Sequence, residues 1–210
     1  MSNADATVFV VDDDPPVLKA IARVLKSAGL NVATFDSPRE FLDRYNADAT
    51  GCLLLDLSMP ELDGLGLQQA LAERGGTTPI VFLTGHGDVP SSVSAMKRGA
   101  CDFLTKPADD EQLIGAVRVA IEKDRSARSA RRELADVRSR LESLTPRERE
   151  VLEHVVSGQL NKQIAADLGT VEKTIKVHRA RVMEKMQVES LAELVQVAQR
   201  AGIVAPARSL

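Results

Sequence analysis

The chain has 210 residues, of which 44% are hydrophobic and 27% are charged, as in ordinary globular proteins of one or two domains. No apolar run approaches the roughly 20 residues of a membrane-spanning helix, and MSNADATVFV lacks the pattern of a secretory signal. We therefore expect a cytoplasmic protein without a membrane partner. Cys52 and Cys101 form no Cys-x-x-Cys pair and are expected to be small core residues.

Acidic and basic residues are distributed unevenly along the chain. The part up to Glu122 has 18 acidic and 10 basic residues, whereas the part from Lys123 onward has 12 acidic and 17 basic residues. The formal net charge of -3 hides this difference. An acidic half joined to a basic half indicates two domains with different partners, the second a candidate for binding nucleic acid.

Strand and helix signals alternate in the acidic half. Short apolar runs predict five strands, at 8–11, 32–35, 53–55, 80–83 and around 103–104. Each is followed by apolar residues at helical spacing, and the second helix opens with Ser37 as its cap and Glu40 reaching back to it. Five alternations predict an α/β fold, a five-stranded doubly wound parallel sheet with helices on both faces.

Polar side chains follow the predicted strands at their carboxyl ends, which a parallel sheet gathers at one edge. Asp12 and Asp13 follow the first strand, Asp56 the third, Thr84 the fourth and Lys106 the fifth. Three neighbouring carboxylates need a cation to stay ionised together, and ligation by oxygen alone suits Mg²⁺. A lysine and a hydroxyl beside them suit phosphoryl transfer. Taken singly, Asp56 also fits the first polar residue of a loop.

Several separated motifs carry a family resemblance: VVDDD, LLLDLSMPELDG, FLTGHGDVP and DFLTKP. In this order they resemble the receiver domain of two-component response regulators, over residues 8–123. The resemblance implies a flavodoxin-like fold in which Asp56 accepts a phosphoryl group from a sensor histidine kinase. It also implies that Asp13, Asp56 and the Ser58 carbonyl ligate Mg²⁺ or another divalent cation, with Asp12 supporting them through water. Such a domain is no enzyme beyond its own phosphorylation and dephosphorylation.

The same resemblance implies a conformational switch. Lys106 would hold a phosphoryl oxygen, Thr84 would swing toward the phosphate, and Phe103 would follow it inward. The switch face would comprise the fourth helix, the fifth strand and the fifth helix. The driving force is the charge of a phosphoryl group, which carries almost two negative charges and strong acceptors. Permanent core packing of Phe103 is the alternative, and His86 is expected to be a loop residue rather than a catalyst.

The segment 123–143 contains neither glycine nor proline, and its composition predicts a helical linker that continues the last helix of the first domain. Leu134, Val137, Leu141 and Leu144 have the spacing of a coiled-coil seam. Two interpretations stay open: a parallel dimer stalk, or a helix whose apolar face rests on a neighbouring domain. The excess of basic residues indicates a solvated face or, alternatively, contact with DNA.

The segment 144–210 predicts an all-α domain of four helices. A capping box, Thr145-Pro146-Arg147-Glu148, opens the first helix, and Ser190 opens the fourth in the same way. A tight turn at Gly169 joins the second and third helices, as in a helix-turn-helix. On the outward side of the third helix lie residues suited to DNA, which are Lys173, Lys176, Val177 and Ala180, flanked by Arg179, Arg181 and Lys185.

The stretch LTPREREVLEHVVSGQLNKQIAADLGTVEKTIKVHRARVMEKM, continuing to residue 198, resembles the LuxR-type DNA-binding domain, and TGHGDVP is similar to the FixJ-like branch of regulators. The resemblance implies that Lys176 and Val177 face bases and that Lys162, Lys173 and Thr174 lie near phosphates. It also implies that the last helix supports dimerisation.

The sequence departs from this family at two positions. Val171 replaces the serine that usually opens the third helix, so we expect Thr170 to cap one residue earlier. Arg181 replaces a frequent asparagine and adds a phosphate contact or shifts the base preference. His178 matches the family and is expected to pack or to form a hydrogen bond rather than to read bases.

The combined prediction is a phosphorylation-controlled transcription factor, mostly an activator. It would form a homodimer when phosphorylated, bind double-stranded promoter DNA and contact RNA polymerase. The domains would be residues 1–122, the linker 123–143, and residues 144–210. One alternative is an aspartate-nucleophile phosphohydrolase, although Asp12-Asp13-Asp14 runs into prolines instead of the Asp-Gly-Thr pattern of such enzymes. Another is a receiver that controls binding of protein or RNA.

Overall fold

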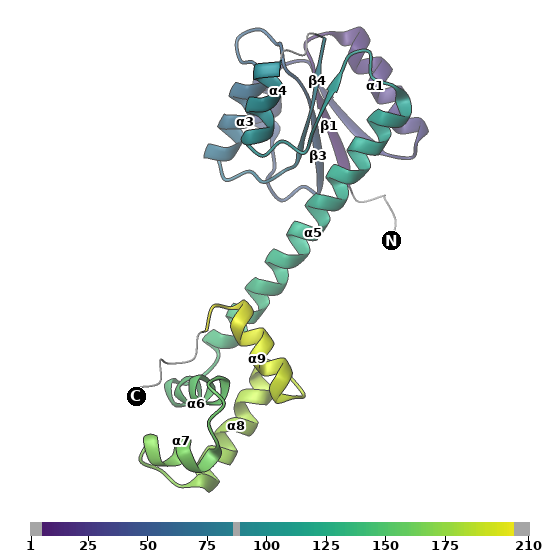
Figure 1. The fold of residues 1–210 in the computed structure, drawn as a ribbon. Helices are drawn as coiled ribbons and strands as arrows, with labels where there is room; N and C mark the ends of the chain where they lie inside the picture. The colour runs from purple at the N-terminus through teal and green to yellow at the C-terminus, as the bar shows by residue number, and fades with distance from the viewer. Residues whose placement is uncertain (1–5, 86–88, 204–210) are drawn as a thin grey trace. The chain divides into compact units, whose positions relative to one another are not determined.

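The structure is a computed structural model that describes residues 6–85 and 89–203 (Figure 1). His86, which the sequence places in a loop, lies outside these residues. The chain divides into two compact units, Met1–Arg128 and Ser129–Leu210. Among the helices of the described ranges, none combines the length and the apolar character that crossing a membrane requires.

The first unit alternates strands and helices. In chain order these are β1 (Thr7–Val11), α1 (Pro15–Ser27), β2 (Asn31–Phe35), α2 (Pro38–Arg44), β3 (Gly51–Asp56), α3 (Gly64–Glu73), β4 (Ile80–Thr84), α4 (Val89–Lys97), β5 (Asp102–Thr105) and α5 (Asp110–Glu142). The strands pair in parallel in the order β2-β1-β3-β4-β5. This confirms the predicted five-stranded doubly wound sheet.

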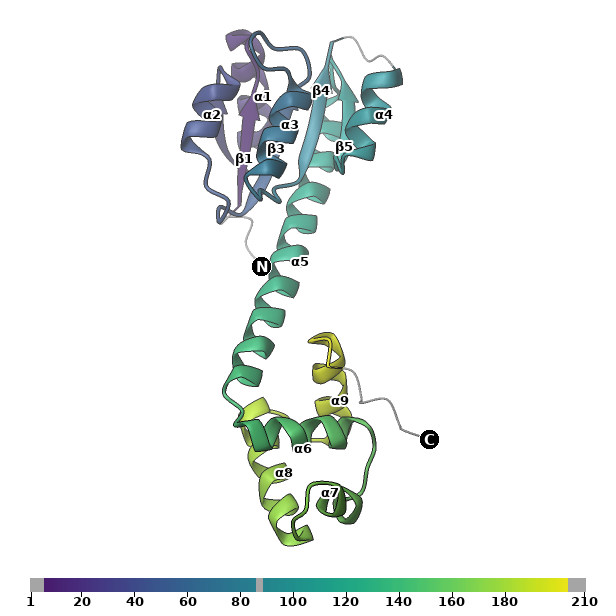
Figure 2. The same ribbon diagram turned by 90° about the vertical axis from the view of Figure 1, so that its left-hand side faces the viewer.

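Strand β3 lies at the centre of this sheet, and all six of its residues are buried. Cys52 and Leu54 pack on one face with residues of α1 and α5, whereas Leu53 and Leu55 pack on the other face with residues of α2 and α3. Figure 2 shows α2, α3 and α4 in front of the sheet. Burial on both faces explains why this strand is an unbroken apolar run.

The helix starts agree largely with the sequence. The Ser37 hydroxyl accepts a hydrogen bond from the Glu40 N–H at 3.1 Å, as predicted for the start of α2. The Glu40 carboxylate, however, accepts from Arg44 at 2.9 Å and does not complete the predicted capping box. An ion pair with the residue one turn later therefore takes the place of the backbone bond in α2.

Helix α5 continues through the predicted linker for 33 residues without a break. Its Asp124 is buried, and the carboxylate Oδ2 accepts hydrogen bonds from the Gly51 N–H at 3.0 Å and from Arg128 Nε at 2.8 Å. Arg128 Nη2 in turn donates to the carbonyls of Ala47 and Ala49, each at 2.8 Å. We call this pair the Asp124–Arg128 clamp. It ties α5 to the loop before β3, within the first unit.

The second unit contains α6 (Pro146–Val156), α7 (Asn161–Asp167), α8 (Glu172–Met186) and α9 (Leu191–Arg200). Their apolar residues form one core, and Val137, Leu141 and Leu144 of the predicted linker seam belong to it. These three residues are at most 8% exposed. The structure thus favours the second interpretation of the linker, because most of the seam packs within its own unit.

The ends of the helices in the second unit confirm one prediction and correct another. Thr145 and Glu148 form the predicted capping box at the start of α6. At the start of α8, Val171 itself occupies the N-cap position, and no side chain caps the helix there. The expectation that Thr170 would cap is wrong, because α8 begins at Glu172 and Thr170 lies outside its first turn.

Candidate functional site

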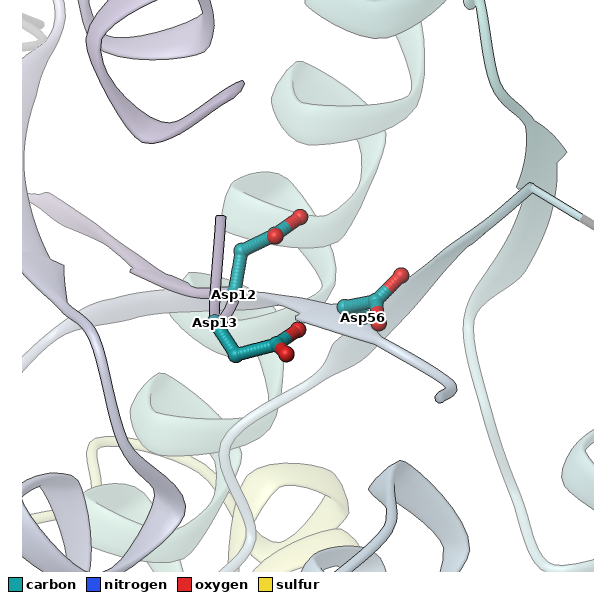
Figure 3. A group of neighbouring side chains, drawn as sticks. All are labelled: Asp12, Asp13 and Asp56. Carbon is teal, nitrogen blue, oxygen red and sulfur yellow. The ribbon is translucent and has the colours of Figure 1, made fainter. Parts of the chain in front are cut away.

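Three aspartates meet at the carboxyl ends of β1 and β3 (Figure 3). Asp12 and Asp13 follow β1, and Asp56 is the last residue of β3, so the pairing of these two adjacent strands brings them together. One carboxylate oxygen from each lies within 4.8 Å of the others. Asp12 and Asp56 are buried, whereas Asp13 is exposed, so the cluster is reached from solvent on the side of Asp13.

Lys106 joins this cluster from the segment after β5. Its Nζ lies 2.5 Å from Asp12 Oδ2 and 2.6 Å from Asp56 Oδ1. The register of β4 and β5 sets this position, because the Lys106 N–H donates to the Thr84 carbonyl at 2.7 Å. The structure therefore brings four predicted residues into one site, with a single ammonium group bridging two buried carboxylates.

Backbone groups fix the two buried aspartates. The second oxygen of Asp56 accepts from the Ser58 N–H at 3.0 Å, and that of Asp12 accepts from the Asp14 N–H at 3.0 Å. Gly64, the first residue of α3, lies so close to β3 that a Cβ there would stand 2.4 Å from the Asp56 carbonyl oxygen. Only glycine allows this approach, which brings the start of α3 beside the site.

The electrostatics of the site follow from its burial. Burial raises the pKa of the Asp56 carboxyl, and the hydrogen bond from Lys106 opposes this only in part. For Lys106, burial acts to lower the pKa, but the hydrogen bonds to Asp12 and Asp56 outweigh it and raise the pKa. Lys106 therefore remains a cation at neutral pH and compensates part of the negative charge of the cluster.

The two predicted switch residues occupy the neighbouring strands β4 and β5. Thr84 is fully buried at the carboxyl end of β4, next to the strand that bears Asp56. Phe103 is half-buried, and its ring lies 6.3 Å from that of Phe82. Phe103 thus packs against the core without being enclosed by it, which leaves both interpretations of this residue compatible with its position.

The donor set of the cluster fits a divalent cation. Carboxylate oxygens from Asp12, Asp13 and Asp56 are hard ligands, and Mg²⁺ in proteins is commonly held by one or two carboxylates together with water and phosphate oxygens. The exposure of Asp13 leaves access for such additional ligands.

The second unit presents a different surface on α8. Its buried face consists of Ile175, Val182 and Met186. The opposite face is exposed and carries the residues predicted for DNA binding, which are Lys173, Lys176, Val177, Ala180 and Arg181. Thr174 is half-buried at the edge of this face, and Lys162 is exposed in the first turn of α7.

Two cations expected to flank this face instead hold the unit together. Lys185 Nζ lies 2.6 Å from the buried carboxylate of Glu148 and donates to the Ser143 carbonyl at 3.0 Å. Arg179 donates to Asn161 Oδ1 at 2.9 Å and so links α8 to the start of α7. His178 has its Nδ1 buried without a hydrogen-bond partner among the described residues, which favours packing over base reading.

Sequence reasoning missed two buried polar residues of the first unit that lie outside these sites, Asp124 and Gln68. Asp124 had a signal, because it continues the buried stripe of Val117, Ala120 and Ile121 on α5, and a charge on such a stripe requires a partner. Gln68 had a similar signal, since it lies beside Leu67 on the buried face of α3. Their backbone partners, which lie far away in the sequence, had no such signal, whereas Arg128 stands one helical turn after Asp124.

The fold and the two sites together define a class of protein: a sheet domain with an acidic cluster, joined to a helix-turn-helix domain. The family model of the response regulator receiver domain matches residues 8–118, and that of the luxR family of bacterial regulatory proteins matches residues 142–198. The chain therefore belongs to the response regulators that carry a LuxR-type DNA-binding domain, and it is a transcription regulator. A sensor kinase and DNA are the partners that these two domains imply.

Relatives match over nearly the whole chain. Nodulation protein W of Bradyrhizobium diazoefficiens is 45% identical over 97% of this chain and 90% of its own length. The transcriptional regulatory protein FixJ of the same species is 42% identical over 94% and 96%, respectively. The response regulator StyR, known from a low-resolution structure, matches with a TM-score of 0.87 and 42% identity over 93% of this chain and 99% of the other. Membership in this family excludes the phosphohydrolase interpretation.

Proposed function

We propose that Asp56 is the phosphoacceptor of this response regulator and that its phosphorylation controls binding of the second unit to promoter DNA. The observation that supports this most strongly is the position of Asp56. It is a buried carboxylate at the end of the central strand, 2.6 Å from a lysine and beside two further aspartates. An aspartate that is simply the first polar residue of a loop would not need to be buried, paired with a lysine and placed beside two other aspartates.

The proposed reaction is a phosphoryl transfer from a histidine of the sensor kinase. Asp56 supplies the attacking oxygen, the P–O bond forms as the P–N bond of the phosphohistidine breaks, and the electron pair stays on the histidine nitrogen. Lys106 holds a phosphoryl oxygen and stabilises the charge that gathers there. Asp13, Asp56 and the Ser58 carbonyl would hold Mg²⁺, with Asp12 in support, and the bound cation would supply charge neutralisation for the phosphoryl oxygens. The domain thus promotes only its own phosphorylation and dephosphorylation.

The buried hydroxyl of Thr84 is the group proposed to read the phosphoryl group. Phosphorylation adds acceptors beside the end of β4, and Thr84 turns toward them. Phe103, which is half-buried on the next strand, then moves into the space that Thr84 leaves. These movements alter the face formed by α4, β5 and the first turns of α5, and they favour a homodimer.

The exposed face of α8 is proposed to enter the major groove of double-stranded promoter DNA. Lys176 and Val177 face the bases, and Ala180 is small enough to approach a thymine methyl group. The proposed phosphate contacts come from Lys162, Lys173, Thr174 and Arg181. A two-fold dimer places two such helices in successive major grooves, from which the regulator contacts RNA polymerase and mostly activates transcription. In this proposal residues 1–122 are the receiver domain, residues 123–143 are the helical linker, and residues 144–210 are the DNA-binding domain.

Phosphorylation of the full-length protein by a small phosphodonor in the presence of Mg²⁺ tests the proposed site. We expect the intact mass of the wild type to increase by one phosphoryl group and that of Asp56→Asn to remain unchanged. Asp13→Asn is a useful companion, because it should reduce the labelling rate without removing the acceptor. Undiminished labelling of Asp56→Asn would show that another residue accepts the phosphoryl group.

A further inference from the structure

Helix α4 is attached to the rest of the first unit by few buried groups. Among its described side chains Ala95 alone is buried, whereas Val93 and Met96 are 44% and 47% exposed. By contrast, the neighbouring α3 buries Leu67 and Leu71. Because Ala95 is the only fully buried side chain among those described in α4, polar contacts to neighbouring elements contribute to its attachment.

Gln68 provides such contacts from the buried face of α3. Its side chain is nearly enclosed, and Nε2 donates to the carbonyl of Ala95 at 3.4 Å and to that of Arg98 at 3.3 Å. Arg98, just after α4, donates in return to the Leu65 carbonyl in the first turn of α3 at 3.5 Å. These side-chain-to-backbone bonds connect the two helices at the carboxyl end of α4.

The orientation of the Gln68 amide leaves one group unsatisfied. Two carbonyls on the side of α4 require the NH₂ group to face them, so Oε1 must point the other way. Oε1 is buried there, and no donor among the described residues reaches it. A buried acceptor without a partner is unfavourable, so the contact between α3 and α4 is less stable than a fully satisfied one. Gln68 therefore holds α4 by two hydrogen bonds whose formation leaves its own Oε1 without a donor among the described residues. This penalty lowers the free energy needed to break them.

We propose that Gln68 is a positioning residue that holds α4 in the resting arrangement of the receiver and releases it when Asp56 is phosphorylated. This inference rests on the proposed function, in which α4 is part of the face that changes on phosphorylation. Gln68 takes no part in the proposed chemistry, since its hydrogen bonds among the described residues go to the carbonyls of Ala95 and Arg98 and not to the acidic cluster. Its substitution should therefore change switching and leave phosphorylation intact.

The neighbouring Gln69 offers a matched control. It lies on the exposed face of the same helix, where its Nε2 donates to Glu73 at 3.0 Å. In Gln68→Leu we expect amide exchange at residues 94–98 of the unphosphorylated protein to rise by about tenfold, the effect of losing one net hydrogen bond. We also expect its unphosphorylated form to bind DNA several-fold more tightly than the unphosphorylated wild type. The gain in DNA affinity on phosphorylation should therefore be smaller in this variant. Gln69→Leu should match the wild type in both measurements.

The outcomes separate this proposal from the proposed function. Equal exchange and equal unphosphorylated DNA affinity in Gln68→Leu and Gln69→Leu would overturn the role of Gln68. A wild type that gains no DNA affinity when Asp56 is phosphorylated would instead contradict the proposed function. If Gln68→Leu does not fold, Gln68→Met serves in its place, because methionine has nearly the same shape and cannot donate. Labelling of Asp56 should be as in the wild type in every variant.

Discussion

At the acidic cluster a single ammonium group compensates two buried carboxylates. Lys106 lies within hydrogen-bonding distance of both Asp12 and Asp56, and each of these carboxylates also accepts a hydrogen bond from a backbone N–H. A phosphoryl group on Asp56 would compete with Asp12 for this ammonium group. Lys106 therefore links Asp56 to Asp12, the residue that follows β1.

In the second unit the buried carboxylate of Glu148 is likewise paired with a lysine, Lys185. The contribution of Glu148 to the stability of this unit should depend on pH. The hydrogen bond from Lys185 lowers the pKa of the Glu148 carboxyl below its ordinary value of 4.5. A carboxyl with a lowered folded-state pKa adds stability that is present above its unfolded pKa and is lost as the pH falls through its folded pKa. We expect Glu148→Gln to be less stable than the wild type by about 2 kcal/mol at neutral pH, the usual cost of a charged hydrogen bond.

The measurement is hydrogen exchange of the core amides of α6 between about pH 6 and about pH 3, with each rate corrected for its intrinsic pH dependence. The difference in stability between the two proteins should shrink as the acid protonates Glu148. A difference that stays constant over this range would show that the ion pair with Lys185 does not stabilise the unit.

At the scale of elements, the start of α8 is weaker than it could be. Val171 occupies the N-cap position and is 64% exposed, and its side chain forms no capping hydrogen bond with the first turn. We expect Val171→Ser to stabilise the second unit by about 1 kcal/mol, because a serine hydroxyl at the N-cap can accept a hydrogen bond from an N–H group of the first turn. Val171→Ala is the control, since alanine removes the valine without providing a cap. If thermal unfolding shows no advantage of serine over alanine, the assignment of this N-cap is wrong.

The Asp124–Arg128 clamp lies at the carboxyl end of the first unit. Removal of the guanidinium in Arg128→Ala leaves the Asp124 carboxylate buried without its cation, which should cost about 3 kcal/mol. Hydrogen exchange should rise at residues 122–128 and in the loop at 47–50, whose carbonyls Arg128 also binds. The exposed Arg132 provides the control, since Arg132→Ala should change neither segment. Equal exchange in both variants would exclude the clamp.

Elements were predictable from the sequence where one physical signal dominated. The apolar run before Asp56 predicted a buried strand, and Thr145 and Glu148 predicted a helix start through their spacing alone. The capping of α8 was not predictable, because Val171 breaks the rule on which such predictions depend. The linker was predicted as a helix, but the choice between a dimer seam and an intramolecular face depended on tertiary packing that spacing does not encode.

At the scale of the whole molecule, the charge distribution indicates that the two parts of the chain bind different partners. The acidic excess up to residue 122 suits a cation and opposes DNA, whereas the basic excess from residue 123 onward favours DNA. The convergence of Asp12, Asp13, Asp56 and Lys106 was predictable, because parallel strands deliver their carboxyl ends to one edge. The hydrogen bonds of Lys185 and Arg179 within the second unit were not predictable. The sequence of a basic helix is the same whether its cations face solvent or bind groups of the same unit.

The most direct test of the central claim is DNA affinity measured at one fixed salt concentration with and without phosphorylation. The probe is a duplex that the phosphorylated protein selects from genomic fragments, and the proteins are the wild type, Asp56→Asn and Lys176→Ala. We predict that phosphorylation tightens binding of the wild type by about tenfold or more, that Asp56→Asn shows no change, and that Lys176→Ala binds more weakly by about 1–3 kcal/mol in both states. A wild type that is fully phosphorylated yet binds with unchanged affinity, or an Asp56→Asn protein that still responds, would contradict the account.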